Sequence, residues 1–255
     1  MITLKNDFEK HLYEIETLGF TIIKQVVSED DCSRMKKLID LELEKDYDKY
    51  GKYSGKSKDL IVDLISTNND FLSIIENDVF FKMFSLVLGE ENILYSYTST
   101  ILRPKVYDAV QNIHVDSYKF IPGFHHGLLA TIALDDFTDQ NGATHYLAGS
   151  QNLEDKPSDE TFNTYSLSTS RKKGDVIFFN PRVWHKAGYN NTDFTRYAMT
   201  IYATRPFIKQ RFDFTKMLSE NYLKPLSERM IKFLGFNSIP PVSVDEYYSS
   251  VKEKK

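Results

Sequence analysis

The stretch Asn112-Ile113-His114-Val115-Asp116 places an imidazole and a carboxylate two residues apart in a chain of 255 residues. On an extended strand, residues i and i+2 point to the same face, so the side chains of His114 and Asp116 can converge on one point. His185, much further along the chain, could bring a second imidazole to that point. Two histidines and one carboxylate on one face of a metal form the ligand set of non-haem Fe(II) sites, which leaves the other positions of the iron open. Such a site requires a β-rich scaffold that brings His185 next to this stretch.

The second half of the chain has the pattern of short strands and turns. Runs rich in β-branched and aromatic residues, separated by turn residues, predict strands near 111–117, 127–134, 144–148, 175–180 and 197–204. An earlier run, 93–102, alternates polar and apolar residues and predicts a strand with one polar face. Asn141-Gly142 is a tight-turn sequence between two of the strands, and the charged stretch 152–173 predicts a long excursion over one end.

Helical patterns stand on both sides of these strands. The N-terminal part contains an expected helix capped by Asn6 or Asp7, a strand over 20–27, and a second helix that begins after the N-cap residue Ser28. Residues 46–59 are polar and contain glycine, which predicts a surface loop. Shorter helices are expected before the strands and after Pro206, over 71–75, 79–88, 214–220 and 226–234.

This order of elements predicts a mainly β protein, an antiparallel sandwich or barrel with helical buttresses. No internal repeat, low-complexity tract or linker divides the sequence, so we expect one domain over 1–255. Within it we expect a helical buttress at 1–90, a β core at about 92–206 and C-terminal helices at 207–255.

Composition argues against several classes of protein. The net charge of −4 arises from well-mixed acidic and basic residues, and no basic stripe indicates nucleic acid as a partner. Cys32 is the only cysteine, so an internal disulfide is impossible and a zinc-thiolate site is implausible. The N-terminal residues have no apolar signal-peptide core, and the longest apolar run, 128–134, is far too short to span a membrane. We therefore expect a cytoplasmic protein with no membrane or nucleic-acid partner.

Two further features accompany the His-x-Asp stretch. Trp184-His185 follows an aromatic-rich strand and a turn at Pro181, and Arg196 stands at the head of another β-rich run. In this order and spacing the chain resembles the phytanoyl-CoA dioxygenase family of Fe(II)- and 2-oxoglutarate-dependent oxygenases, from Gly19 to about Thr204. The resemblance implies a double-stranded β-helix core, the jelly-roll or cupin-like fold, with N-terminal and C-terminal helices.

Individual residues match the family's site. His114 and Asp116 match its His-x-Asp motif, and His185 matches its distal histidine. Arg196 matches its 2-oxoglutarate-binding arginine, and Asn141-Gly142 matches its Asn-Gly turn. The resemblance implies that the two histidines and the aspartate are both the metal ligands and the catalytic residues, with Fe(II), 2-oxoglutarate and O2 as cofactor and co-substrates. The far carboxylate of 2-oxoglutarate would bind the fork-shaped, permanently cationic guanidinium of Arg196.

The implied reaction is the hydroxylation of a small organic substrate, with succinate and CO2 as co-products. Asp116 favours this outcome over halogenation, because related halogenases lack the carboxylate so that chloride can bind the iron. Tyr97 and Thr131 are the candidates to hydrogen-bond 2-oxoglutarate. The chain departs from the family at Ala148-Gly149-Ser150-Gln151, where Pro-Gly-Ser-His is usual, and at Thr131, where many members carry tryptophan. Both departures bear on contacts with the substrate and on secondary contacts with the co-substrate.

Two other functions stay open. A catalytically inactive cupin-like protein with a binding or regulatory role would keep the fold, and a metal-dependent hydrolase or isomerase would keep the ligands. Neither explains an arginine at position 196. Polar, tyrosine-rich segments and the lack of a basic cluster for the phosphates of coenzyme A favour a polar metabolite as the substrate. Cations at strand ends are candidates for binding an anionic substrate, although such residues are usually only solvated: Arg103, Lys105, Arg182 and Arg205. No pattern predicts the oligomeric state.

Overall fold

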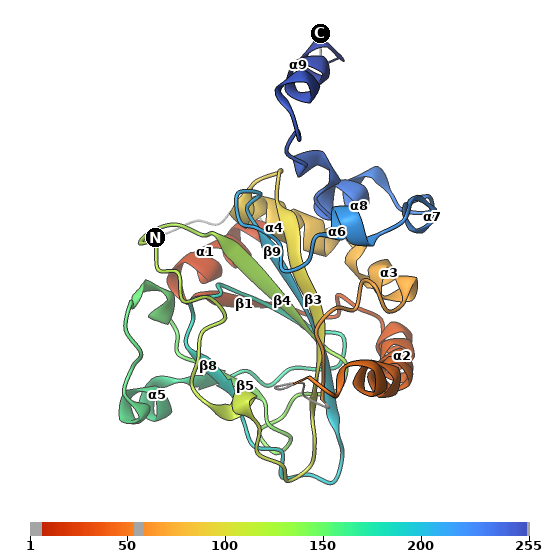
Figure 1. The fold of residues 1–255 in the computed structure, drawn as a ribbon. Coiled ribbons are helices and arrows are strands. Elements are labelled where there is room, and N and C mark those ends of the chain that lie inside the picture. Colours follow the sequence, from red (N-terminus) through yellow and green to blue (C-terminus); the bar gives the residue numbers. More distant parts are fainter. Residues whose placement is uncertain (1–6, 54–58, 254–255) are drawn as a thin grey trace.

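Two antiparallel sheets form the centre of the protein in a computed structural model that describes residues 7–53 and 59–253 (Figure 1). The larger sheet has six strands in the order β1-β7-β4-β9-β3-β2, and the smaller has three in the order β6-β5-β8. The expected mainly β architecture with flanking helices is confirmed. The strands are β1 (Phe20–Ile23), β2 (Leu60–Ile61), β3 (Ile93–Leu102), β4 (Gly127–Ala133), β5 (Thr144–Tyr146), β6 (Leu167–Ser168), β7 (Val176–Phe179), β8 (His185–Ala187) and β9 (Arg196–Thr204).

The large sheet has two different faces because successive side chains of a strand alternate. On β3, Ile101 and Tyr97 belong to the main hydrophobic core, whereas Thr98 and Thr100 face a cavity. The same alternation holds on β9, where Ile201 faces the core. One face of the sheet is therefore covered by helices, and the other looks toward the smaller sheet.

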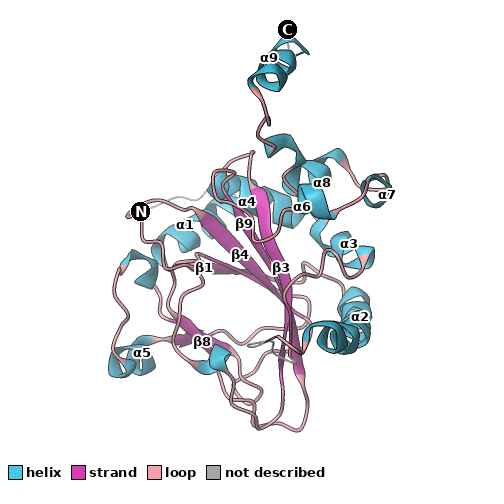
Figure 2. Ribbon diagram, viewed as in Figure 1, coloured by secondary structure: helices cyan, strands magenta, loops and turns pink. Residues whose placement is uncertain are grey.

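The helices gather on one side of the large sheet (Figure 2). Helix α5 lies beside the small sheet instead, and the C-terminal helix α9 projects away from the rest of the chain. The helices are α1 (Asp7–Thr17), α2 (Glu29–Tyr50), α3 (Leu72–Ile75), α4 (Asp78–Leu88), α5 (Asp159–Tyr165), α6 (Phe214–Met217), α7 (Glu220–Leu223), α8 (Glu228–Phe233) and α9 (Val244–Glu253). Short 3-10 turns occur at Asn69–Phe71, Ala109–Gln111, Ser150–Asn152 and Phe236–Ser238. Within the described residues, no helix is both long enough and apolar enough to cross a membrane.

A cluster of phenylalanines joins the helices to the sheet. The ring centroid of Phe84 on α4 lies 5.7 Å from that of Phe233 on α8 and 6.0 Å from that of Phe178 on β7. Phe80, one turn before Phe84, lies 5.9 Å from Phe178. Because all four side chains are almost completely buried, this cluster contributes much of the apolar area that the fold removes from water.

Helix α2 begins as expected and ends later than expected. The Oγ of Ser28 accepts a hydrogen bond from the backbone N–H of Asp31 at 3.0 Å, which is the predicted N-cap. The helix continues to Tyr50, so the predicted loop over 46–59 is wrong for its first residues. Asp46 continues the buried stripe of Ile39 and Leu43 at helical spacing, but as an acid it carries no apolar signal. Residues 54–58 lie outside the described residues.

The predicted strand over 111–117 is also wrong. The chain there is irregular, and His114 forms a single isolated bridge with His185. Beyond it, the backbone N–H groups of Asp116 and Ser117 both donate to the carbonyl oxygen of Pro181, at 2.9 and 3.1 Å. Proline has no N–H to return, so a regular ladder cannot continue past this point.

The phenylalanine cluster gives a test of this core. We expect Phe178→Ala to lower the free energy of unfolding by about 3–5 kcal/mol, because the change leaves a cavity between the sheet and α4. Phe194→Ala removes the same side chain where it is 80% exposed and should cost less than about 0.5 kcal/mol. Denaturant unfolding followed by circular dichroism measures both, and equal losses would contradict the assignment of the core.

Candidate metal centre

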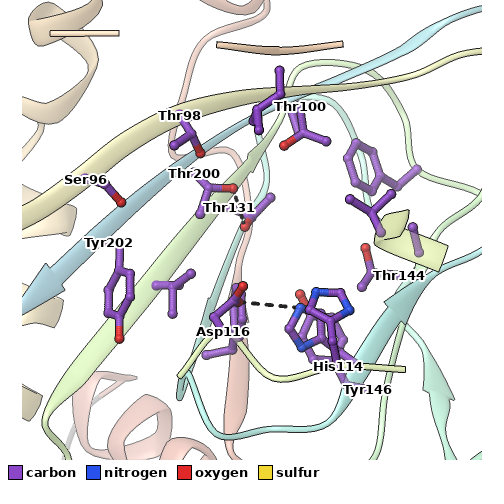
Figure 3. A pocket seen from close by; sticks show the side chains of 18 of the residues that line it. Ser96, Thr98, Thr100, His114, Asp116, Thr131, Thr144, Tyr146, Thr200 and Tyr202 are labelled. Carbon is purple, nitrogen blue, oxygen red and sulfur yellow. Dashed lines mark hydrogen bonds and ion pairs between the residues drawn. The ribbon is translucent and has the colours of Figure 1, made fainter. Parts of the chain in front are cut away.

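Three side chains with metal-binding atoms meet between the two sheets. His114, Asp116 and His185 each offer one ligand atom, and these atoms lie within 4.8 Å of one another. Nε2 of His185 is 3.5 Å from a carboxylate oxygen of Asp116, and the two imidazole centroids are 4.3 Å apart. Figure 3 shows Asp116 and His114 on the same side of the cavity, as expected for residues two apart. The sequence prediction that these three residues lie together agrees with the structure.

Backbone carbonyls determine which nitrogen of each imidazole carries the proton. Nδ1 of His114 lies 2.8 Å from the carbonyl oxygen of Asn112, and Nδ1 of His185 lies 2.9 Å from that of Val183. A carbonyl oxygen only accepts hydrogen bonds, so each Nδ1 carries the proton. In the neutral rings, Nε2 is then unprotonated and free to bind a metal, which is the usual arrangement for histidine ligands.

His185 is held in a dry environment. Its ring stacks on Tyr146 and meets Phe179 edge-on, with centroid distances of 5.2 Å in both cases. Burial lowers the pKa of His185 to about 4, because the charged imidazolium would lose its hydration. The ring is therefore neutral near pH 7, as a metal ligand must be. Two imidazole nitrogens and one carboxylate oxygen are donor atoms that fit a divalent iron ion.

The triad opens onto a cavity of about 250 Å³ between the sheets. The opposite wall carries a group of hydroxyl side chains on neighbouring strands, shown in Figure 3. The hydroxyls of Thr131 and Thr200 lie 2.9 Å apart and share a hydrogen bond. The hydroxyl residues that line this cavity are Ser96, Thr98, Thr100, Thr131, Thr144, Thr200, Tyr146 and Tyr202.

Arg196 lines the same cavity and is only 5% exposed. Its Nη1 donates to the carbonyl oxygen of Gly142, and its guanidinium carbon lies 4.0 Å from the ring centroid of Phe137. Its Nε has no hydrogen-bond partner within the described residues. Burial lowers the pKa of Arg196 to about 9, and the nearby positive charge of Arg171 lowers it further, while the charge of Asp135 compensates only in part. A buried, incompletely paired guanidinium in a cavity fits an anionic ligand.

The Asn141-Gly142 turn supports that arginine. Gly142 has φ of +85°, which glycine adopts without strain. A Cβ at this position would lie 2.6 Å from the carbonyl oxygen of Gly188. The expected turn is therefore present, and its backbone carbonyl is the one that accepts from Arg196.

Of the two candidates to contact 2-oxoglutarate, Thr131 lines the cavity and Tyr97 does not. Tyr97 is fully buried in the helix-covered core, where its hydroxyl donates to the carbonyl oxygen of Phe71 at 3.4 Å. Its neighbours Ser96 and Thr98 face the cavity instead. The choice of Tyr97 is therefore corrected: it stands one residue out of phase with the polar face of β3, and alternation along the strand could have shown this.

The cations at strand ends have other partners. Arg103 and Lys105 form ion pairs with Asp59 and Asp193, both at 2.6 Å. Arg182 donates to the backbone carbonyls of residues 117, 153 and 154, and Arg205 donates to that of residue 125. None of the four is among the residues that line the cavity. The cavity instead contains Arg211, which the sequence pattern did not single out.

A protein-family model described as "Phytanoyl-CoA dioxygenase (PhyH)" matches residues 15–198. "Uncharacterized protein Rv1501" of Mycobacterium tuberculosis is 27% identical over 183 residues, which cover 70% of this chain and 67% of that protein. "Dioxygenase ALT11" of Alternaria alternata is 32% identical over 111 residues, covering 43% of this chain and 36% of the relative. "Dioxygenase sphC" of Aspergillus fumigatus is 26% identical over 191 residues, covering 70% and 52%.

Solved structures share the fold at low identity. AviO1 from Streptomyces viridochromogenes superposes with a TM-score of 0.64 and 17% identity, covering 81% of this chain and 99% of that one. SnoN, described as a non-heme alpha ketoglutarate dependent epimerase from nogalamycin biosynthesis, gives a TM-score of 0.60 and 16% identity, covering 78% and 83%. The expected jelly-roll architecture is confirmed by this likeness.

The geometry of the triad predicts a single metal site. We expect the protein to bind one Fe(II) or Co(II) per chain, and His114→Ala to weaken binding by at least about 100-fold, since even the loss of an outer partner costs 10–100-fold. His145→Ala is the control, because His145 lies on β5 outside the lining of this cavity and should leave binding unchanged. Calorimetric titration with Co(II) measures the affinities. Unchanged binding in His114→Ala would contradict the site.

Proposed function

The chain belongs to the phytanoyl-CoA dioxygenase family, and on this basis we propose that it is an Fe(II)- and 2-oxoglutarate-dependent dioxygenase that hydroxylates a small organic metabolite. Succinate and CO2 are the proposed co-products. One observation carries the proposal: the His114, Asp116 and His185 triad shares a single cavity with the buried guanidinium of Arg196. A metal and a dicarboxylate are the two ligands that this pair of features fits.

The roles of the residues follow from their chemistry. Nε2 of His114, Nε2 of His185 and the carboxylate of Asp116 would hold Fe(II), which supplies the activation of O2 when it is bound together with 2-oxoglutarate. Arg196 would pair with the far carboxylate of 2-oxoglutarate through its two-pronged guanidinium. Phe137 keeps the guanidinium plane in place by stacking against it.

Two groups of side chains shape the space around these ligands. The hydroxyls of Thr131 and Thr200 lie on the cavity wall and are proposed to hydrogen-bond 2-oxoglutarate or the substrate. Tyr146 and Phe179 surround the ring of His185 and keep water away from it. Because a dry, preorganised site strengthens every charge interaction in it, these rings also support binding of the co-substrate.

The alternatives account for less of the site. The intact triad together with Arg196 weighs against a binding protein without turnover, because an inactive site has no need for a buried arginine at that position. A metal-dependent hydrolase or isomerase leaves the buried Arg196 without a ligand. Asp116 favours hydroxylation over halogenation, and the hydroxyl-lined wall favours a polar metabolite. The absence of a possible internal disulfide makes the cytoplasm the proposed compartment.

Arg196 provides the direct test of the co-substrate. We expect the wild-type protein to convert 2-oxoglutarate to succinate only with Fe(II), and Arg196→Gln to raise the KM for 2-oxoglutarate by about 10–100-fold, because a charge-assisted hydrogen-bond pair is lost. Arg103→Gln is the matched control, since Arg103 pairs with Asp59 outside the cavity and its loss should leave KM unchanged. Succinate is measured by chromatography. Turnover without iron, or an unchanged KM in Arg196→Gln, would sink the proposal.

The two faces of the sheet give a second test. Thr131→Val removes a hydroxyl that faces the cavity and should raise the KM for 2-oxoglutarate by about 3–10-fold, the usual worth of one neutral hydrogen bond. Tyr97→Phe removes a hydroxyl on the opposite face and should leave KM as in the wild type. The same succinate measurement compares the two variants, and the reverse ranking would show that the cavity wall is misassigned.

A further inference from the structure

The cavity extends along strand β9 and has a different residue at each end of that strand. Arg196 and Tyr202 are six residues apart on β9 and both line the cavity, so they lie roughly 20 Å apart along the strand at about 3.3 Å per residue. On the antiparallel neighbour β3, Leu102 pairs with Arg196 and Ser96 pairs with Tyr202. The end near Arg196 is proposed for the co-substrate, so the end near Tyr202 is free for the substrate. Figure 3 shows Ser96 and Tyr202 together, away from Thr100 and Thr144.

Arg211 lies at this second end. Its guanidinium carbon is 5.5 Å from the ring centroid of Tyr95, and the Tyr95 ring is 4.8 Å from that of Tyr202. The register of β3 shifts between Leu94 and Ser96, and such a bulge turns the extra residue, Tyr95, toward the cavity side of the sheet. The guanidinium of Arg211 thus packs against Tyr95, which itself packs against Tyr202 at the proposed substrate end of the cavity.

The backbone around Arg211 is held in place. Its N–H donates to the carbonyl oxygen of Tyr95 at 3.1 Å. The side chain of Gln210 donates to the carbonyl oxygens of Leu94 and Leu234 at 2.6 and 3.1 Å. The segment therefore presents Arg211 at a fixed place, while the guanidinium itself stays exposed at the mouth of the cavity.

The charge of Arg211 is not compensated locally. Arg103 and Arg229 form ion pairs with carboxylates, whereas Arg211 forms none within the described part of the chain. With the proposed ligands bound, the charge of Fe(II) balances that of 2-oxoglutarate, and Asp116 balances Arg196. Apart from the two histidine ligands, the acidic and basic side chains that line the cavity are Asp116, Arg196 and Arg211. The positive charge of Arg211 is therefore the one that no other charge in the cavity balances.

We propose that Arg211 binds an anionic group of the substrate, a carboxylate or a phosphate, and so determines the substrate class of the site. Guanidinium groups pair with both anions through two parallel hydrogen bonds. The cavity of about 250 Å³ is smaller than the roughly 300–1,000 Å³ that encloses a drug-sized ligand, and it must also hold 2-oxoglutarate. The substrate is therefore a small acid, or the acidic end of a longer molecule that extends out of the mouth. This inference rests on the proposed function, which assigns the other end to 2-oxoglutarate.

The test compares a small acid with its neutral amide. The protein is loaded with Fe(II) and saturating 2-oxoglutarate without oxygen, which fills the Arg196 end, and NMR titration measures the dissociation constants of butanoate, butanamide and propyl phosphate. We expect butanoate or propyl phosphate to bind about tenfold more tightly than butanamide, the effect of one charge-assisted pair. The stronger of the two anions identifies the acidic group.

Variants assign this preference to one residue. Arg211→Gln should remove the preference for the anion and leave the dissociation constant of 2-oxoglutarate as in the wild type, which also shows that the cavity is intact. Arg211→Lys should keep part of the preference. Lys209→Gln removes the same charge from an exposed neighbour outside the cavity and should keep all of it.

Three outcomes would overturn the inference. Equal binding of acid and amide by a protein that binds 2-oxoglutarate rejects the role of Arg211 and leaves the proposed function standing, as does a preference that persists in Arg211→Gln. A wild-type protein that binds iron but not 2-oxoglutarate rejects the proposed function and this inference with it.

Discussion

The reciprocal backbone pairing of His114 and His185 is the contact on which the site depends. Each residue donates its N–H to the carbonyl oxygen of the other at 3.0 Å, and together they form the isolated bridge between an irregular segment and strand β8. These two hydrogen bonds place the imidazoles next to each other, and Asp116 follows because its own N–H is held by Pro181. Because the backbone sets the spacing of the two imidazoles, less conformational entropy is lost when a ligand binds.

Because side chains alternate across the large sheet, one face stabilises the fold and the other lines the cavity of the site. The face toward the helices is apolar and includes Tyr97 and Phe178, and the face toward the small sheet carries hydroxyls such as those of Thr131 and Thr200. Neighbouring residues on one strand thus serve different purposes. Because a shift of one residue would exchange the two faces, the apolar face also fixes the register that positions the cavity wall.

The burial of Arg196 connects energetics with function. Removing a guanidinium from water is unfavourable unless hydrogen bonds or an opposite charge compensate it. Among the described residues Arg196 contacts the carbonyl oxygen of Gly142 and the ring of Phe137 but forms no direct ion pair, and the charge of Asp135 compensates it only from a distance. An anionic co-substrate would supply the missing charge, so the same residue that destabilises the empty cavity favours its occupied form. Arg211 differs because it is exposed, and water screens its charge until a ligand arrives.

The sequence by itself determined the residue types of the site and the class of fold. His114, Asp116, His185 and Arg196 could be named from their chemistry, order and spacing and from the family resemblance they support, and the β-rich pattern predicted the sheets, with β3 at its observed bounds. Only the tertiary structure decided which hydroxyls meet at the cavity and that Arg211 lies at its mouth, whereas the outward position of Tyr97 could have been predicted from the alternation along β3. The physical reason is that local patterns report periodicity and propensity, whereas strand register, a bulge at Tyr95 and the packing of distant segments arise from contacts between residues far apart in the chain. Arg211 follows the last strand in a polar segment, so no local signal ties it to Ser96 or Tyr202.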